Sequence, residues 1–146
     1  MTAPARTGLR STADRIRHAL TFELVGLGLL SLGGAALTGL PAMHLGVLGA
    51  VGAGVATLWN YAYNLAFDRL MLWRSGTTRK TVALRLLHAV LFELGLMAVL
   101  LPFTMWYLGL GFWPALGLDL GVALFYMAYA LVFNWVYDRV FPLPPL

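Results

Sequence analysis

Residues 83–106 read ALRLLHAVLFELGLMAVLLPFTMW, an almost unbroken apolar stretch with a single glutamate. A helix of about 20 residues is long enough to cross roughly 30 Å of hydrocarbon. Three further stretches of this kind lie at 16–38, 45–67 and 112–137. Open sheets are excluded at that depth because their edge groups would lack hydrogen-bond partners. The sequence therefore predicts an all-α integral membrane protein with four transmembrane helices.

The composition of the chain is that of a membrane protein. Of its 146 residues, 60% are hydrophobic and 11% are charged, and the mean hydropathy is +0.79. Soluble domains carry about 25% charged residues, so this chain lacks the polar surface that a soluble protein needs. The four helices use nearly all of the 146 residues, which leaves no room among them for a soluble catalytic domain. Cysteine is absent, which excludes disulfides and thiolate metal sites.

The basic residues all lie at one side of the predicted helices. Four arginines precede or open the first helix, five basic residues surround the connection between the second and third, and Arg139 follows the fourth. The turns near 38–44 and 108–117 carry none. Lys and Arg are retained on the cytoplasmic side, so we expect both termini and the middle connection to be cytoplasmic. The net charge of +4 then reflects topology and contact with anionic membrane lipid, and we expect no nucleic-acid partner.

The chain contains an internal repeat with an offset of 70 residues and no gap. The motif Arg-x-x-His-Ala-x-x-Phe-Glu-Leu at 15–24 returns at 85–94. The motif Tyr-Asn-x-x-Phe-Asp-Arg at 63–69 returns as Phe-Asn-x-x-Tyr-Asp-Arg at 133–139. Because the offset covers two helices, the halves are parallel repeats, each a helical hairpin.

The repeat divides the chain into five expected segments. They are a cytoplasmic N-terminal segment 1–14, a first transmembrane hairpin 15–74, a cytoplasmic linker 75–80, a second transmembrane hairpin 81–142 and a tail 143–146. The simplest assembly places the two hairpins face to face, with Glu23 and Glu93 near the seam.

Each repeat places a glutamate inside an apolar helix, where an ionisable side chain is costly and marks a candidate functional site. From Arg15 to Glu23 is about 12 Å at ~1.5 Å per residue, which puts this carboxyl group within the cytoplasmic half of the membrane. Burial there disfavours its charged form, and such a group can exchange a proton for an organic cation. Glu23 is favoured over Glu93 because the first hairpin is rich in glycine. In the alternative, both glutamates are structural groups that bond across a helix interface.

His18 and His88 each precede a glutamate by five residues, which is not the i, i+4 spacing of zinc-binding helices. We therefore expect no metal site. Each histidine is expected near the headgroup level, bonded to a neighbouring acid or to the aspartate that ends the partner helix.

Two Asn–Asp pairs, Asn64–Asp68 and Asn134–Asp138, close the second and fourth helices at i, i+4 spacing. As structural groups they would bond across helices, or to Arg15 and Arg85, and so fix the helix ends. As functional groups they would form a polar entry gate. The structural role is favoured.

Aromatic residues gather at the same end of the second and fourth helices. They are Trp59, Tyr63, Phe67, Tyr126, Tyr129, Phe133 and Tyr137. They form either an aromatic belt at the membrane interface or a cage for an organic cation, with each ring worth about 0.5–2 kcal/mol. Trp59 and Tyr126 lie deeper than belt residues do, whereas Trp73, Trp106 and Trp113 fit the belt. Small residues at Gly46, Ala50 and Gly54, and at Gly117 and Gly121, have the spacing that permits close helix approach.

Together these motifs resemble the proteobacterial antimicrobial compound efflux (PACE) family, the chlorhexidine-type exporters. The resemblance covers about residues 15–142 and includes all four motifs in order. It implies a secondary active transporter rather than an enzyme, which exports cationic biocides such as chlorhexidine and short diamines across the bacterial inner membrane. It further implies the proton as coupling ion, no cofactor, proton and substrate binding at Glu23, and a possible homodimer.

The candidate proton- and substrate-binding residues are Glu23, Glu93, Trp59, Asn60, Tyr63, Asn64 and Tyr126. The candidate motif or gate residues are Arg15, His18, Phe22, Asp68, Arg85, His88, Asn134 and Asp138. Asp119 matches Gly49 in the first half and is either a periplasmic exit residue or an interfacial acid, with the interfacial position favoured. The alternative function is that of a non-transporting structural or assembly membrane protein. An intramembrane enzyme is disfavoured because no Ser–His pair lies at a plausible depth.

Overall fold

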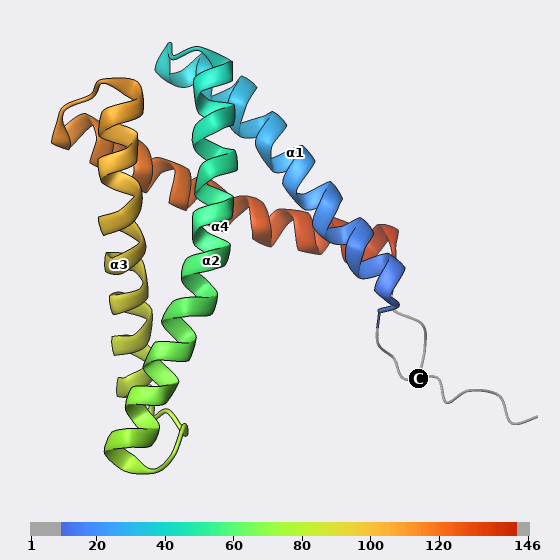
Figure 1. The fold of residues 1–146 in the computed structure, drawn as a ribbon. Helices are drawn as coiled ribbons and strands as arrows, with labels where there is room; N and C mark the ends of the chain where they lie inside the picture. Colours follow the sequence, from blue (N-terminus) through green and yellow to red (C-terminus); the bar gives the residue numbers. More distant parts are fainter. Residues whose placement is uncertain (1–9, 143–146) are drawn as a thin grey trace, which may run out of the picture. The chain divides into compact units, whose positions relative to one another are not determined.

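The computed structural model describes residues 10–142 and consists there of four long helices joined by short connections (Figure 1). The helices are α1 (Thr12–Thr38), α2 (Ala42–Ser75), α3 (Val82–Leu108) and α4 (Phe112–Val140). By length and composition each is able to cross a membrane. Within the described range there is no strand, so the predicted all-α fold with four transmembrane helices is confirmed. The predicted tail 143–146, and most of the N-terminal segment, lie outside the described residues.

Glycine ends the first helix of each hairpin. Gly39 (φ 74°) and Gly109 (φ 64°) adopt the left-handed conformation, and their N–H groups donate to the carbonyls of Ala35 and Met105. This arrangement is a common helix C-terminus because glycine reaches positive φ without steric cost. The two glycines are 70 residues apart. The second turn is shorter than the predicted 108–117, since α4 already begins at Phe112.

Helix α2 extends past its predicted apolar stretch, as far as Ser75. Its 34 residues give a length of about 51 Å at ~1.5 Å per residue, which exceeds the roughly 30 Å of the hydrocarbon layer. The added turns carry Asp68, Arg69 and Arg74, and Gly76 (φ 66°) follows the last turn. The basic end of α2 therefore reaches beyond the apolar layer.

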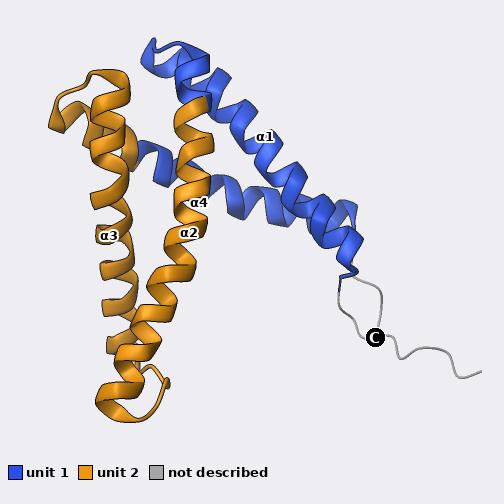
Figure 2. Cartoon of the chain, in the orientation of Figure 1, with its two compact units in different colours: residues 1–46, 121–146 blue, residues 47–120 orange. Residues whose placement is uncertain are grey.

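The chain packs as two compact units (Figure 2). Unit 1 comprises residues 1–46 and 121–146, and unit 2 comprises residues 47–120. Unit 1 therefore combines α1 with the C-terminal part of α4, and unit 2 combines most of α2 with α3. In each unit, the helix that opens one repeat packs against the helix that closes the other repeat.

Most large apolar side chains are exposed, as expected for helices whose solvent is hydrocarbon. Leu24 is 70% exposed and Leu131 is 71% exposed. Close helix contact occurs at only part of the predicted small-residue stripe. A Cβ at Gly46 would lie 3.0 Å from the Ser31 hydroxyl. The described residues leave open space at three other glycines of the stripe, which are Gly54, Gly117 and Gly121.

Candidate functional site

In unit 1 the opening motif on α1 packs against the closing motif on α4. The Nε2 atom of His18 lies 2.8 Å from Oδ1 of Asn134. The His18 ring meets the ring of Tyr137 at 4.6 Å between centroids, nearly edge to face. One turn deeper, the hydroxyl of Tyr129 donates to the carbonyl of Phe22 over 2.8 Å. Polar and aromatic contacts thus join the two helices along one seam.

Unit 2 repeats this seam with residues that lie 70 positions away. The Nε2 atom of His88 lies 3.1 Å from Oδ1 of Asn64, and its ring meets Phe67 at 4.6 Å. The indole N–H of Trp59 donates to the carbonyl of Phe92 over 3.1 Å. In both units the partner of the histidine is an asparagine amide. The predicted contact of each histidine with an aspartate or another acid is therefore wrong.

The asparagine of unit 2 has further polar contacts. Nδ2 of Asn64 donates to Oδ1 of Asn60 over 2.8 Å, which holds the amide in place for His88. The hydroxyl of Tyr63 donates to the carbonyl of His88 over 2.9 Å. These four predicted site residues therefore form one contact group between α2 and α3.

The aspartates at the ends of α2 and α4 bind basic residues that precede the opening helices. Asp138 pairs with Arg10 in unit 1, and Asp68 pairs with Lys80 over 3.1 Å in unit 2. Arg10 also pairs with Asp14 over 2.5 Å, and this hydrogen bond raises the pKa of the Arg10 guanidinium.

Of the two structural alternatives for the Asn–Asp pairs, the structure shows bonds across helices, from Asn134 to His18 and from Asn64 to His88. The other alternative, pairing of the aspartates with Arg15 and Arg85, is wrong. The Nε–H of each arginine instead donates over 3.3 Å to a backbone carbonyl five residues earlier, that of Arg10 or Lys80. The physical reason is that side chains on a helix lean toward its N-terminus. Arg15 and Arg85 therefore stay with the start of their own helix. Arg10 and Lys80, which precede the helices, reach the aspartates of the partner helices instead.

Glu23 lies within electrostatic range of two tyrosines of α4 in unit 1. Its carboxylate is exposed in the chain and close enough to Tyr126 and Tyr129 to interact with them electrostatically. The Tyr126 hydroxyl is buried and has no hydrogen-bond partner among the described residues. Gly26 makes room for this arrangement, since a Cβ there would lie 2.9 Å from the Tyr129 ring and 3.3 Å from the Tyr126 ring.

Glu93 in unit 2 is also exposed, but its surroundings differ. The position that matches Tyr126 is Ala56, and the position that matches Tyr129 is Trp59. The Trp59 ring packs directly against Gly95. The Glu93 site therefore lacks both hydroxyl groups that stand beside Glu23. That Glu23 and Glu93 lie near a common seam between the two hairpins stays a prediction.

The aromatic residues of unit 1 pack mainly on one another. The Phe22 ring lies 4.9 Å from the Tyr129 ring and 5.2 Å from the Phe133 ring. Tyr129 is 9% exposed and Tyr137 is 4% exposed. These rings pack in a row along the two helices. The hydroxyls of Tyr129 and Tyr137 have hydrogen-bond partners, whereas the Tyr126 hydroxyl has none among the described residues.

Asp119 forms a buried polar contact that the sequence analysis missed. Its Oδ1 atom accepts a hydrogen bond of 2.7 Å from the Thr104 hydroxyl. Asp119 is 8% exposed and Thr104 is 0% exposed, so Asp119 is buried between α3 and α4, while its position at the membrane interface stays a prediction. The matching positions in the first repeat are Gly34 and Gly49. Both positions therefore differ between the repeats, and this joint difference was the sequence signal for a contact between Thr104 and Asp119.

Comparison with known proteins gives the same family that the motifs suggest. The family profile described as "BTP: Chlorhexidine efflux transporter" matches residues 10–73 and again residues 80–143. The chain therefore belongs to the chlorhexidine efflux transporter (PACE) family, and it is a multi-pass membrane protein of a transporter family rather than an enzyme.

Two relatives are similar over most of their length. The chain is 39% identical over 130 residues to the short-chain diamines transporter of Vibrio parahaemolyticus, covering 88% of this chain and 91% of that protein. It is 32% identical over 126 residues to the short-chain diamines transporter of Acinetobacter baylyi, covering 86% of this chain and 88% of that protein. No solved structure matches the chain.

Proposed function

We propose that this protein exports organic dications and monocations, such as chlorhexidine-type biocides and short-chain diamines, in exchange for protons. The family profile and the names of the two relatives support this class of substrate. The placement of all basic residues at one side of the helices supports an orientation with both termini in the cytoplasm. The membrane is then the bacterial inner membrane.

The observation that carries the proposal is the group formed by Glu23, Tyr126 and Tyr129 in unit 1. A carboxylate supplies the charge that an ammonium or biguanide group requires, and aromatic faces attract cations by about 0.5–2 kcal/mol each. The unpartnered Tyr126 hydroxyl can accept a hydrogen bond from an N–H group of the substrate. A proton and a cation compete for the Glu23 carboxylate, so binding of the cation is coupled to release of the proton.

The proposed cycle has three steps. Glu23 loses its proton toward the cytoplasm and binds a cation. The helices then rearrange so that the site opens to the other side. A proton from the periplasm displaces the cation and returns Glu23 to its neutral form. The His–Asn contacts of the two seams would keep the basic ends of the paired helices together while the site closes to the cytoplasm and opens to the periplasm.

The charge of the substrate sets the driving force. Exchange of one proton for one monocation is electroneutral, so the pH gradient alone drives it. Export of a dication against one proton moves a net positive charge out of the cell, which costs about 2.3 kcal/mol per 100 mV of membrane potential. A second proton, carried by Glu93, would remove this cost.

The test is transport by the purified protein in proteoliposomes with an imposed pH gradient. The wild type should move protons when a short diamine or chlorhexidine is added, and Glu23→Gln should not. Glu93→Gln serves as the matched control, and should still move protons when the short diamine is added. If a folded wild-type protein moves neither protons nor cations, the alternative of a non-transporting structural or assembly protein is favoured.

A further inference from the structure

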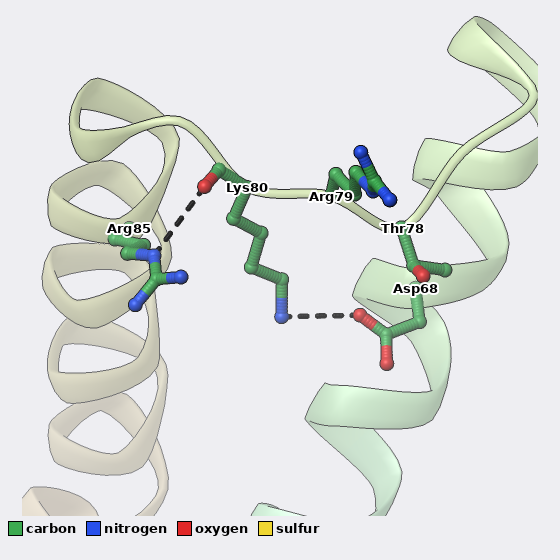
Figure 3. Close-up of a pocket in the computed structure, with 5 residues that line it drawn as sticks. All are labelled: Asp68, Thr78, Arg79, Lys80 and Arg85. Atoms are coloured by element: carbon green, nitrogen blue, oxygen red, sulfur yellow. Dashed lines mark hydrogen bonds and ion pairs between the residues drawn. The ribbon is translucent and has the colours of Figure 1, made fainter.

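A pocket lies between the end of α2 and the start of α3 in unit 2 (Figure 3). Its volume is about 350 Å³, which falls within the usual range for small-molecule sites of roughly 300–1,000 Å³. The lining residues are Asp68, Thr78, Arg79, Lys80 and Arg85. Three of these five side chains are basic and one is acidic, so the lining carries a net positive charge.

The single carboxylate of the pocket is already neutralised. Asp68 pairs with Lys80 over 3.1 Å, as the dashed line in Figure 3 shows. Arg85 uses its Nε–H on the Lys80 carbonyl, which leaves its two terminal NH₂ groups available. Neither Arg79 nor Arg85 has a carboxylate partner in the described part of the chain. The pocket therefore presents two guanidinium groups whose charge the protein does not balance.

The corresponding end of unit 1 is built differently. There Asp14 pairs over 2.5 Å with both Arg10 and Arg17. The Arg17 guanidinium also lies 3.6 Å from the centroid of the Phe141 ring. In unit 2 the positions matching Asp14 and Arg17 are both leucine. Among the described residues, unit 1 therefore leaves one arginine at the start of α1, Arg15, without a carboxylate partner, whereas the pocket of unit 2 has two, Arg79 and Arg85.

We propose that this pocket binds the phosphate group of an anionic phospholipid headgroup. The planar guanidinium group matches phosphate oxygens in a bidentate way, and the Thr78 hydroxyl offers a further donor. Basic pockets beside transmembrane helices on the side of the basic loops bind such headgroups. Trp73, on the same end of α2, is 80% exposed, which is typical of a residue at the headgroup level. This position favours a lipid phosphate over free phosphate.

The test uses the full chain, purified in a neutral detergent, with bound lipids counted by native mass spectrometry. The probes are phosphatidylglycerol, phosphatidylcholine and inorganic phosphate. The variant Arg79→Gln/Arg85→Gln removes both guanidinium groups from the pocket. The control Arg69→Gln/Arg74→Gln removes the same charge from exposed positions on α2 outside the pocket.

We expect the wild type to bind phosphatidylglycerol in preference to phosphatidylcholine. The pocket variant should weaken phosphatidylglycerol binding about thirtyfold, which corresponds to ~1 kcal/mol for each arginine, and the control variant by less than about threefold. Equal losses in the two variants would overturn the proposal, because they would reflect net charge alone. Equal binding of the two lipids by the wild type would also overturn it. Displacement of phosphatidylglycerol by equimolar inorganic phosphate would reassign the pocket to free phosphate.

Folding of each variant is checked by circular dichroism in the same detergent. If the glutamine variant is unfolded, Arg79→Lys/Arg85→Lys keeps the charge and removes the bidentate geometry. That variant should bind phosphatidylglycerol several-fold more weakly than the wild type, and unchanged binding would contradict the assigned geometry. These outcomes do not depend on the proposed transport activity, since they concern binding of lipid in the absence of any gradient.

Discussion

Replacing Tyr126 with phenylalanine should separate substrate binding from stability. The Tyr126 hydroxyl is buried and lacks a partner among the described residues, so its removal deletes no protein hydrogen bond. A buried polar group without a partner costs about 1–3 kcal/mol, so Tyr126→Phe should leave the thermal stability unchanged or raise it. A hydrogen bond to a charged ligand contributes about 1.5–3 kcal/mol, so the affinity for a diamine should fall by roughly tenfold or more.

The matched control is Tyr129→Phe, one turn along α4. The Tyr129 hydroxyl donates to the Phe22 carbonyl over 2.8 Å, so this variant should lose about 0.5–1.5 kcal/mol of stability. Affinity is measured by isothermal titration in detergent, and stability by thermal unfolding in the same buffer. The reasoning is refuted if Tyr126→Phe destabilises the protein while its affinity for the diamine stays at the wild-type value.

Two further substitutions test the packing of unit 2. Thr104→Val removes the only hydrogen-bond donor that the described residues offer to the buried Asp119 carboxyl group, and should lower the free energy of unfolding by about 1–3 kcal/mol in a denaturant titration. An unchanged midpoint of the denaturant titration would contradict the hydrogen bond between Thr104 and Asp119. Gly95→Ala would push a Cβ into the Trp59 ring, and should cost about 1–3 kcal/mol, measured by thermal unfolding. Gly54→Ala is the control, since it has open space around it, and equal losses at both glycines would contradict the packing.

The sequence predicted the four-helix fold and the family but not the pairing of the helices. Because the offset of 70 makes the two closing motifs equivalent, His18 could meet either Asn64 or Asn134. Apolar patterns carry no information that separates these choices, since both place an amide at the same depth. The structure pairs His18 with Asn134 and His88 with Asn64, each across the repeats.

Two groups were missed for identifiable reasons. Arg10 and Lys80 lie before the recognisable motif, although they are both basic and are 70 residues apart. Thr104 lies inside an apolar helix, where a threonine commonly bonds to the backbone of its own helix, so its contact with Asp119 could not be foreseen. The sequence did single out Glu23 and Tyr126, and in unit 1 they are close enough to interact electrostatically.

The most direct test of the exchange at Glu23 is the release of protons when a cation binds. The purified protein in weakly buffered detergent solution, with a pH indicator, is mixed with a short diamine at a series of pH values. We predict proton release by the wild type and by Glu93→Gln. We predict none by a Glu23→Gln variant that is folded in the same detergent. Equal proton release by Glu23→Gln and the wild type would contradict the assignment of Glu23 as the residue that exchanges a proton for the substrate.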